Sequence, residues 1–163
     1  MHSLLDERFM RGALAEARRA GRAGEVPVGA LVVSASGEVL ARGHNLMIAR
    51  HDPTAHAEVV ALRRAARRAR NYRLTGALLY VTLEPCLLCL GAMAHARVGR
   101  LVYAAADPKR GAMAAARGRD VAPLLHHRFR VTPGVLADEA SDLLRAFFKA
   151  RRPSGRGIES LLD

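Results

Sequence analysis

The segment ALLYVTLEPCLLC, residues 77–89, decides the fold of this 163-residue chain. Its first part, residues 77–83, is a continuous apolar run of strand length, which is typical of a strand buried on both faces of a sheet. Pro85 favours the start of a helix, which we predict over residues 86–97. A buried strand that leads directly into a helix indicates a sheet covered by helices on both sides.

Hydrophobic periodicity and turn residues predict the remaining elements. We expect helices over residues 3–20, 55–70 and 138–152, strands over 26–33, 38–45, 100–105 and 129–136, and an irregular segment over 107–120. This order predicts an α/β fold, a three-layer α/β/α sandwich with a central mixed five-stranded sheet. We expect residues 1–152 to form a single domain and residues 153–163 to form a polar, flexible tail. In such sheets, sites lie where strands end and helices begin.

The composition favours a compact cytoplasmic protein. Half of the residues are hydrophobic, and a chain of this length can bury a substantial core without disulfide bonds. Residues 1–12 include acidic side chains and no continuous apolar run, so they do not resemble a secretory signal. The longest apolar run, residues 77–81, is too short to span a bilayer, so we expect no membrane partner.

The formal charge of +11 suits a polyanionic partner, and nucleic acid fits better than lipid because no amphipathic anchor is visible. A second interpretation explains the same total. Lys109 and Lys149 are the only lysines, so the excess is almost entirely arginine set among many alanines. A compositional bias toward both residues would give this charge without any binding role, and the charge alone leaves both interpretations open.

Cys86 and Cys89 are the only cysteines, and they could form a redox pair, half of a zinc site or two buried apolar residues. Residues three apart in a first helical turn share a face, and the helix dipole favours the thiolate that binds metal. Zinc takes four ligands, and His56, at the start of another helix, is the best-placed third. One His and two Cys leave the fourth position to water, whose pKa zinc lowers toward ~7.

Glu58 is the candidate proton carrier, since attack on an amidine-like carbon requires protons to reach a ring nitrogen and the departing amine. On an ideal helix, however, His56 and Glu58 would lie about 200° apart around the axis. Spacing alone therefore does not bring them to one metal, although an irregular first turn could.

The motifs PTAHAEV, residues 53–59, and TLEPCLLCLGAM, residues 82–93, resemble the cytidine deaminase-like zinc deaminases, whose pattern is H-x-E…P-C-x-x-C. The chain is similar, more closely, to bacterial tRNA-specific adenosine deaminases. EVPVGALVV (25–33), NYRL (71–74) and DPKRGA (107–112) extend the resemblance over nearly the whole chain. It implies a cytidine deaminase-like fold and hydrolytic conversion of the wobble adenosine of a tRNA anticodon to inosine.

By this resemblance, one Zn²⁺ per subunit is held by His56, Cys86 and Cys89, and Glu58 shuttles protons. The resemblance also implies the substrate contacts. These are Asn45 on the purine, Pro27 and Val28 along the base pocket, and Asp107, Lys109, Phe147, Phe148, Arg151 and Arg152 near the anticodon loop. It further implies a homodimer whose neighbouring subunit helps to shape the RNA site.

Two other functions remain open. A free guanine or cytosine deaminase would use the same zinc motifs. A non-catalytic RNA-binding domain would instead have a structural zinc closed by a fourth ligand such as His51 or His95. Some single residues also have plainer interpretations. Asn45 by itself is typical of a turn, and the apolar stripe of the last helix predicts that either Phe147 or Phe148 lies in the core.

Overall fold

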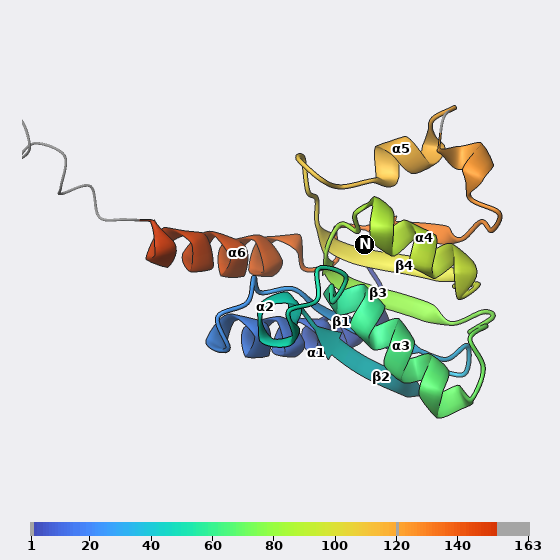
Figure 1. Cartoon of the computed structure of the whole chain (residues 1–163), viewed down its shortest axis with the longest axis horizontal. Coiled ribbons are helices and arrows are strands. Elements are labelled where there is room, and N and C mark those ends of the chain that lie inside the picture. The colour runs from blue at the N-terminus through green and yellow to red at the C-terminus, as the bar shows by residue number, and fades with distance from the viewer. Residues whose placement is uncertain (1, 120, 153–163) are drawn as a thin grey trace, which may run out of the picture.

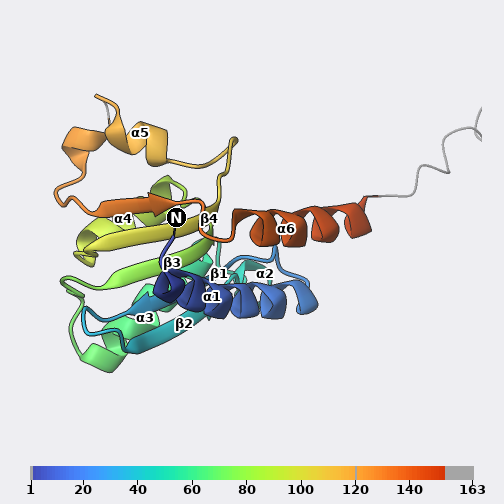
Figure 2. The same ribbon diagram turned by 180° about the vertical axis from the view of Figure 1, so that it is seen from behind.

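Figure 1 shows the computed structural model, which describes residues 2–119 and 121–152. The predicted tail, residues 153–163, lies outside the described residues. A five-stranded sheet lies between helices on both faces, which confirms the predicted sandwich (Figures 1 and 2). Among the described residues, no helix is long and apolar enough to cross a membrane.

The sheet is mixed, and its strands follow the order β2-β1-β3-β4-β5. β1 pairs antiparallel with β2 and β3, whereas β3, β4 and β5 pair in parallel. The bounds are Gly29–Val33 for β1, Val39–His44 for β2, Leu78–Leu83 for β3, Arg100–Ala105 for β4 and Arg130–Pro133 for β5. With these directions, the carboxyl ends of β2, β3 and β4 meet at one edge, together with the start of β1.

The helices form one layer on each face, and α6 projects past the sheet (Figures 1 and 2). α3 and α4 cover one face, while α1 covers the other. The bounds are Leu4–Arg22 for α1, Met47–Arg50 for α2, Ala57–Ala69 for α3, Leu87–His95 for α4, Met113–Arg117 for α5 and Ala137–Arg151 for α6, with a 3-10 turn at Ala122–Leu124. α2 and α5 were not predicted, because four or five residues are too few to show a helical period.

The core follows from the alternation of side chains along the strands. In β1, Ala30 and Val32 are buried in the cluster beneath α3 and α4, whereas Leu31 and Val33 belong to the cluster beneath α1. β3 is apolar along nearly its whole length because its side chains alternate between the same two clusters, and helices cover both of its faces.

Gly43 lets α3 pack directly on β2. A Cβ atom at this position would lie 2.6 Å from the backbone nitrogen of Ala61, closer than real Cβ contacts come. The close approach holds the start of α3 near the sheet edge where β2 ends.

A buried ion pair ties α1 to the sheet. Asp6 is 4% exposed, and its carboxylate accepts hydrogen bonds from Arg100 Nη2 at 2.8 Å and from the Tyr80 hydroxyl at 2.8 Å. Burial alone would raise the pKa of Asp6, but the hydrogen bonds from Arg100, Tyr80 and Ser3 outweigh it and lower that pKa below the ordinary 3.8.

Asp6→Asn should lower the free energy of unfolding by about 2–3 kcal/mol at pH 7, because Arg100 and Tyr80 lose their charged partner. The folded-state pKa of Asp6 is depressed, so its stabilisation is complete above the unfolded value and disappears as the pH falls through the folded value. Urea unfolding should therefore show the parent and the variant converging below pH ~4. Glu7→Gln is the control, since Glu7 forms an exposed pair with Arg11. Equal losses in both variants would contradict this assignment.

Candidate metal centre

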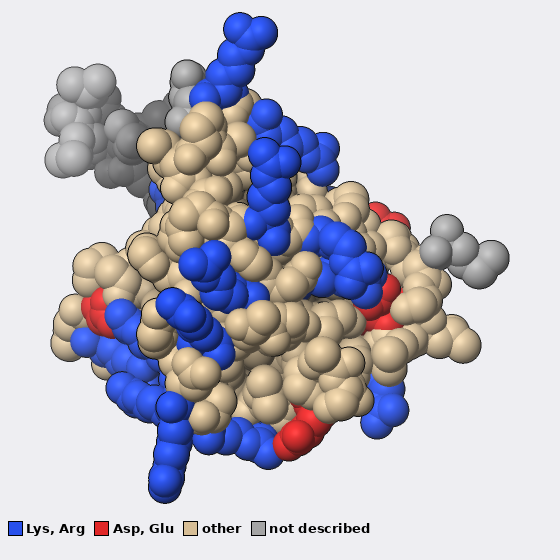
Figure 3. All heavy atoms as spheres, turned by 90° about the vertical axis from the view of Figure 1, so that its right-hand side faces the viewer, with Lys and Arg blue, Asp and Glu red and all other residues tan. Residues whose placement is uncertain are grey.

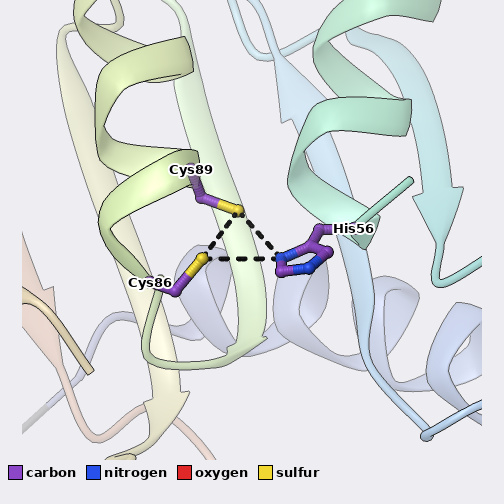
Figure 4. A group of neighbouring side chains, drawn as sticks. All are labelled: His56, Cys86 and Cys89. Atoms are coloured by element: carbon purple, nitrogen blue, oxygen red, sulfur yellow. Dashed lines mark hydrogen bonds between the residues drawn. The ribbon is translucent and has the colours of Figure 1, made fainter. Parts of the chain in front are cut away.

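The three predicted zinc ligands come together at the sheet edge (Figure 4). His56 Nδ1 lies 3.5 Å from Cys86 Sγ and 3.5 Å from Cys89 Sγ, and the two sulfur atoms are 3.7 Å apart. Tetrahedral zinc, with bonds of about 2.1 Å to nitrogen and 2.3 Å to sulfur, separates such donors by about 3.6 and 3.8 Å. The donor set therefore fits zinc in both chemistry and spacing.

Two helix starts bring these donors together. His56 is the N-cap of α3 (φ −66°, ψ 151°), and Cys86 is the N-cap of α4 (φ −80°, ψ 175°). Both residues have extended backbone, so the 200° separation of an ideal helix does not apply to His56 and Glu58. Cys89 follows in the first turn of α4. The positive ends of both helix dipoles favour thiolate at this point.

The protonation states of the three donor side chains depend on one another. Hydrogen bonds from Cys89 and His56 lower the pKa of Cys86 to about 3. The hydrogen bond with the Cys86 thiolate, together with burial, raises the pKa of Cys89. The pKa of His56 is also raised, chiefly by its hydrogen bond with Cys86. Zinc binding therefore has to displace protons from Cys89 and His56.

Glu58 lies beside the donors, in the first turn of α3, and is 4% exposed. Burial raises the pKa of its carboxyl group to about 7. A carboxyl group placed beside the metal donors can both accept and release a proton during turnover.

A small cavity of ≈ 150 Å³ opens next to this cluster. Val28 and Asn45, which the family resemblance assigns to the base, line it together with His56 and Glu58. Asp107, which the resemblance assigns to the anticodon loop, also lines this cavity. Cys86 also lines the cavity. Five further lining residues were not among the predicted site residues: Val26, Met47, Leu83, Glu84 and Arg110. Glu84 and Arg110 lie within motifs that carry the family resemblance, so their position in those motifs was an available signal.

Asn45 organises the backbone around the cavity. Its Nδ2 donates to the Val26 carbonyl at 3.0 Å, and its Oδ1 accepts from the Ala57 amide at 2.9 Å. The side chain thus joins the end of β2, the segment before β1 and the start of α3. One N–H and one oxygen lone pair of the amide remain available for a further partner.

Pro27 does not line this cavity. The Val28 amide donates to the Val26 carbonyl at 2.8 Å, so the chain makes a γ-turn with Pro27 at its centre. Val26 and Val28 line the cavity on either side of this turn. Pro27 instead lines a crevice between α1 and α6, where it meets Phe147.

The predicted RNA contacts on α6 divide into two groups. Lys109, Phe148 and Arg152 line a groove of ≈ 830 Å³ beside α6, the α6 groove, together with Leu144, Arg145, Lys149 and Arg151. Phe147 lies instead under the Arg151 guanidinium, which is 3.7 Å from its ring centre and also donates to the Gly24 carbonyl at 3.3 Å.

The prediction that Phe147 or Phe148 lies in the core is wrong. Phe147 is half-buried and Phe148 is 49% exposed. The outer part of α6 extends beyond the sheet, so its apolar side chains have no sheet face to cover (Figure 1).

The other histidines lie apart from the donor cluster. His95, at the end of α4, packs on His126 with ring centres 4.8 Å apart, and His127 Nε2 hydrogen-bonds to the Val98 carbonyl at 2.7 Å. Within residues 2–119 and 121–152, the cluster at this site contains only His56, Cys86 and Cys89. The fourth protein ligand that a closed structural zinc site requires is therefore not found among the described residues.

Comparisons with known proteins identify the family. The family described as the cytidine and deoxycytidylate deaminase zinc-binding region matches residues 4–105. The chain is 44% identical over 162 residues to the tRNA-specific adenosine deaminase of Haemophilus influenzae. This match covers 99% of this chain and 94% of that protein.

Two solved structures are also similar. One comes from a study of A-to-I editing by tRNA:A34 deaminases at the wobble position. It has a TM-score of 0.78 and 43% identity, and the match covers 84% of this chain and 99% of that one. The guanine deaminase of Nitrosomonas europaea has a TM-score of 0.75 and 28% identity, with 90% and 85% covered. Together with the paired donor motifs, these similarities show that the chain belongs to the cytidine and deoxycytidylate deaminase zinc-binding family.

Proposed function

We propose that this protein is a zinc-dependent deaminase that converts the wobble adenosine of a tRNA anticodon to inosine. The main support for this proposal is the triangle of donor atoms from His56, Cys86 and Cys89. The buried Glu58 lies next to it, at a cavity of ≈ 150 Å³. The chain is 44% identical to a tRNA-specific adenosine deaminase and only 28% identical to the guanine deaminase. This difference supports adenosine in tRNA as the substrate. Because tRNA is the proposed substrate, we infer that the enzyme acts in the cytoplasm.

Glu58 would carry the protons of this reaction. Zinc, when bound by His56, Cys86 and Cys89, supplies a water of lowered pKa as the nucleophile. Replacing an exocyclic amino group by oxygen requires one proton on the ring nitrogen and another on the leaving amine. The Glu58 carboxyl group lines the cavity beside His56 and Cys86, where it can take up and release these protons.

The cavity would hold one flipped base. Val28 offers an apolar wall, and Asn45 offers the free N–H and lone pair of its amide. RNA loops present splayed bases, so an enzyme with a small pocket need not open a duplex to reach its target.

The α6 groove would hold the rest of the anticodon loop. Its basic side chains suit phosphates, and the exposed ring of Phe148 suits stacking on an unpaired base. Phe147 and Arg151 contact each other, and Arg151 also reaches Gly24, so we assign these two residues to holding α6 in place. Total charge supports this assignment less strongly, because several basic side chains also lie on the side of the molecule opposite to α6 (Figure 3).

We further propose that the protein is a homodimer, joined through the face where α3 meets α4. This face contains a largely apolar groove of ≈ 590 Å³, and the exposed Tyr72, Leu87 and Leu88 line it. Leu87 directly follows the zinc-site residue Cys86, so a second copy on this face would lie next to the metal centre. Exposed large apolar side chains gathered at one groove are typical of an interaction surface.

Purified protein should form inosine on an anticodon stem-loop with adenosine at the wobble position, measured by nucleoside analysis. Glu58→Gln should slow the reaction at least ~100-fold while zinc content stays at one ion per chain, because only proton transfer is lost. His56→Ala and Cys86→Ala should lose both zinc and activity.

Glu38→Gln is the matched control, since that carboxylate is exposed and pairs with Arg68. Ammonia release from guanine or cytosine, with none from the RNA, would favour the free-base deaminase. Full activity of Glu58→Gln would contradict the catalytic role of Glu58.

Phe148→Ala should weaken binding of the stem-loop about fivefold to 100-fold, because one stacking platform is lost. Lys149→Ala should weaken it uniformly across sequences and reduce the salt slope by about one. Fluorescence anisotropy over a salt series measures both effects. Leu124→Ala, which removes an exposed side chain outside the α6 groove, should change nothing. Unchanged affinity in both α6 variants would place the RNA elsewhere.

Leu88→Glu should convert the dimer into a monomer in analytical ultracentrifugation, because it buries a charge in an apolar interface. Leu4→Glu is the control, since Leu4 is 86% exposed at the start of α1. A monomeric parent protein would contradict the proposed assembly.

A further inference from the structure

We propose that Glu84 is a positioning residue that shapes the loop of residues 106–113, and that this loop determines how tightly the RNA substrate is held. The part of this inference that concerns RNA rests on the proposed function. Glu84 follows β3 directly and lies two residues before Cys86, at the wall of the cavity.

The Glu84 carboxylate holds both ends of this loop. Its Oε2 accepts a hydrogen bond from the Asp107 amide at 3.0 Å, and its Oε1 accepts one from the Met113 amide at 3.0 Å. The Glu84 amide itself donates to the Ala105 carbonyl at 2.8 Å. Hydrogen bonds from N–H groups to an ionised carboxylate are about twice as strong as neutral ones, so a single side chain closes the loop.

Asp107 builds the turn inside the loop. Its Oδ1 accepts from the amides of Lys109 at 3.0 Å and Arg110 at 3.1 Å, and its carbonyl accepts from the Gly111 amide at 2.9 Å. Because Glu84 holds the Asp107 backbone, it indirectly sets the position of the whole turn.

Gly111 shows how closely the loop wraps around the carboxylate. A Cβ atom at Gly111 would lie 2.3 Å from Glu84 Cδ and 2.5 Å from the Asp107 carbonyl oxygen. Both distances are far below van der Waals contact, so the loop can enclose Glu84 only with glycine at this position.

The loop supplies side chains to both proposed substrate surfaces. Asp107 and Arg110 line the cavity, while Lys109 lines the α6 groove. The Ala112 amide also donates to the Pro85 carbonyl at 3.0 Å, next to Cys86. A shift of the loop would therefore displace RNA contacts while the zinc donors, which are held by α3 and α4, stay in place.

The test uses Glu84→Gln, Gly111→Ala and the double variant, each combined with Glu58→Gln so that binding is measured without turnover. The Gln amide group turns an N–H toward one of the two loop amides and loses that bond, whereas the Ala methyl group displaces the loop from the other side. Each change should weaken stem-loop binding about tenfold to 100-fold. The double variant should be no weaker than the worse single variant, since both act on one contact.

With Glu58 intact, each variant should raise KM for the stem-loop by the same factor, while kcat stays within about threefold of the parent. Zinc content should remain at one ion per chain. Glu139→Gln is the matched control, because its carboxylate forms an exposed pair with Arg11. If the losses of affinity add up in the double variant and zinc is also lost, the proposal is overturned in favour of a general structural role for Glu84 and Gly111.

Amide hydrogen exchange separates this proposal from the proposed function. In Glu84→Gln, the amide of Asp107 or of Met113 that loses its acceptor should exchange faster than in the parent, whatever the enzyme acts on. Unchanged exchange would overturn the positioning role of Glu84. Faster exchange with RNA affinity within about twofold of the parent would overturn the link between the loop and RNA. Absence of inosine formation in the parent would count against the proposed function, and the exchange result would still decide the role of Glu84.

Discussion

The convergence of two helix N-termini at one sheet edge is the constraint on which the rest of the site depends. α3 and α4 begin at the sheet edge where β2 and β3, the two strands that flank β1, come to their ends. Their N-caps, His56 and Cys86, face each other there with donor atoms 3.5 Å apart. The helix dipoles stabilise thiolate at the point where a cation is needed. The packing of α3 on Gly43 keeps this geometry in place, because a larger residue there would push the helix away from the sheet.

Several polar side chains at the cavity hold the backbone and also face the substrate space. Asn45 caps α3 and ties it to the segment before β1, and Glu84 closes the loop of residues 106–113. Rigid placement of this kind lowers the entropy cost of holding a base in a reactive position. Substitutions at these positions would therefore act on binding and orientation before they affect the fold, in contrast to Asp6, whose hydrogen bonds join α1 to the sheet.

In the proposed function, the α6 helix separates RNA recognition from the chemical step. It projects beyond the sheet (Figure 2), and Phe148 and several basic residues line the α6 groove beside it. An extended RNA loop can reach these side chains while a single base enters the cavity.

The sequence by itself determined the layered fold and the metal donors, because alternation, continuous apolar runs and paired motifs depend on local spacing. The short helices α2 and α5, the direction in which Pro27 points and the exposure of both Phe147 and Phe148 were decided by tertiary structure. Tertiary structure also decided whether His56 and Glu58 could share one site, because α3 begins only after His56. The role of Glu84 appears only when a loop 23–29 residues further along the chain folds back onto its carboxylate. Such long-range contacts carry no periodic signal, and only the packed structure reveals them.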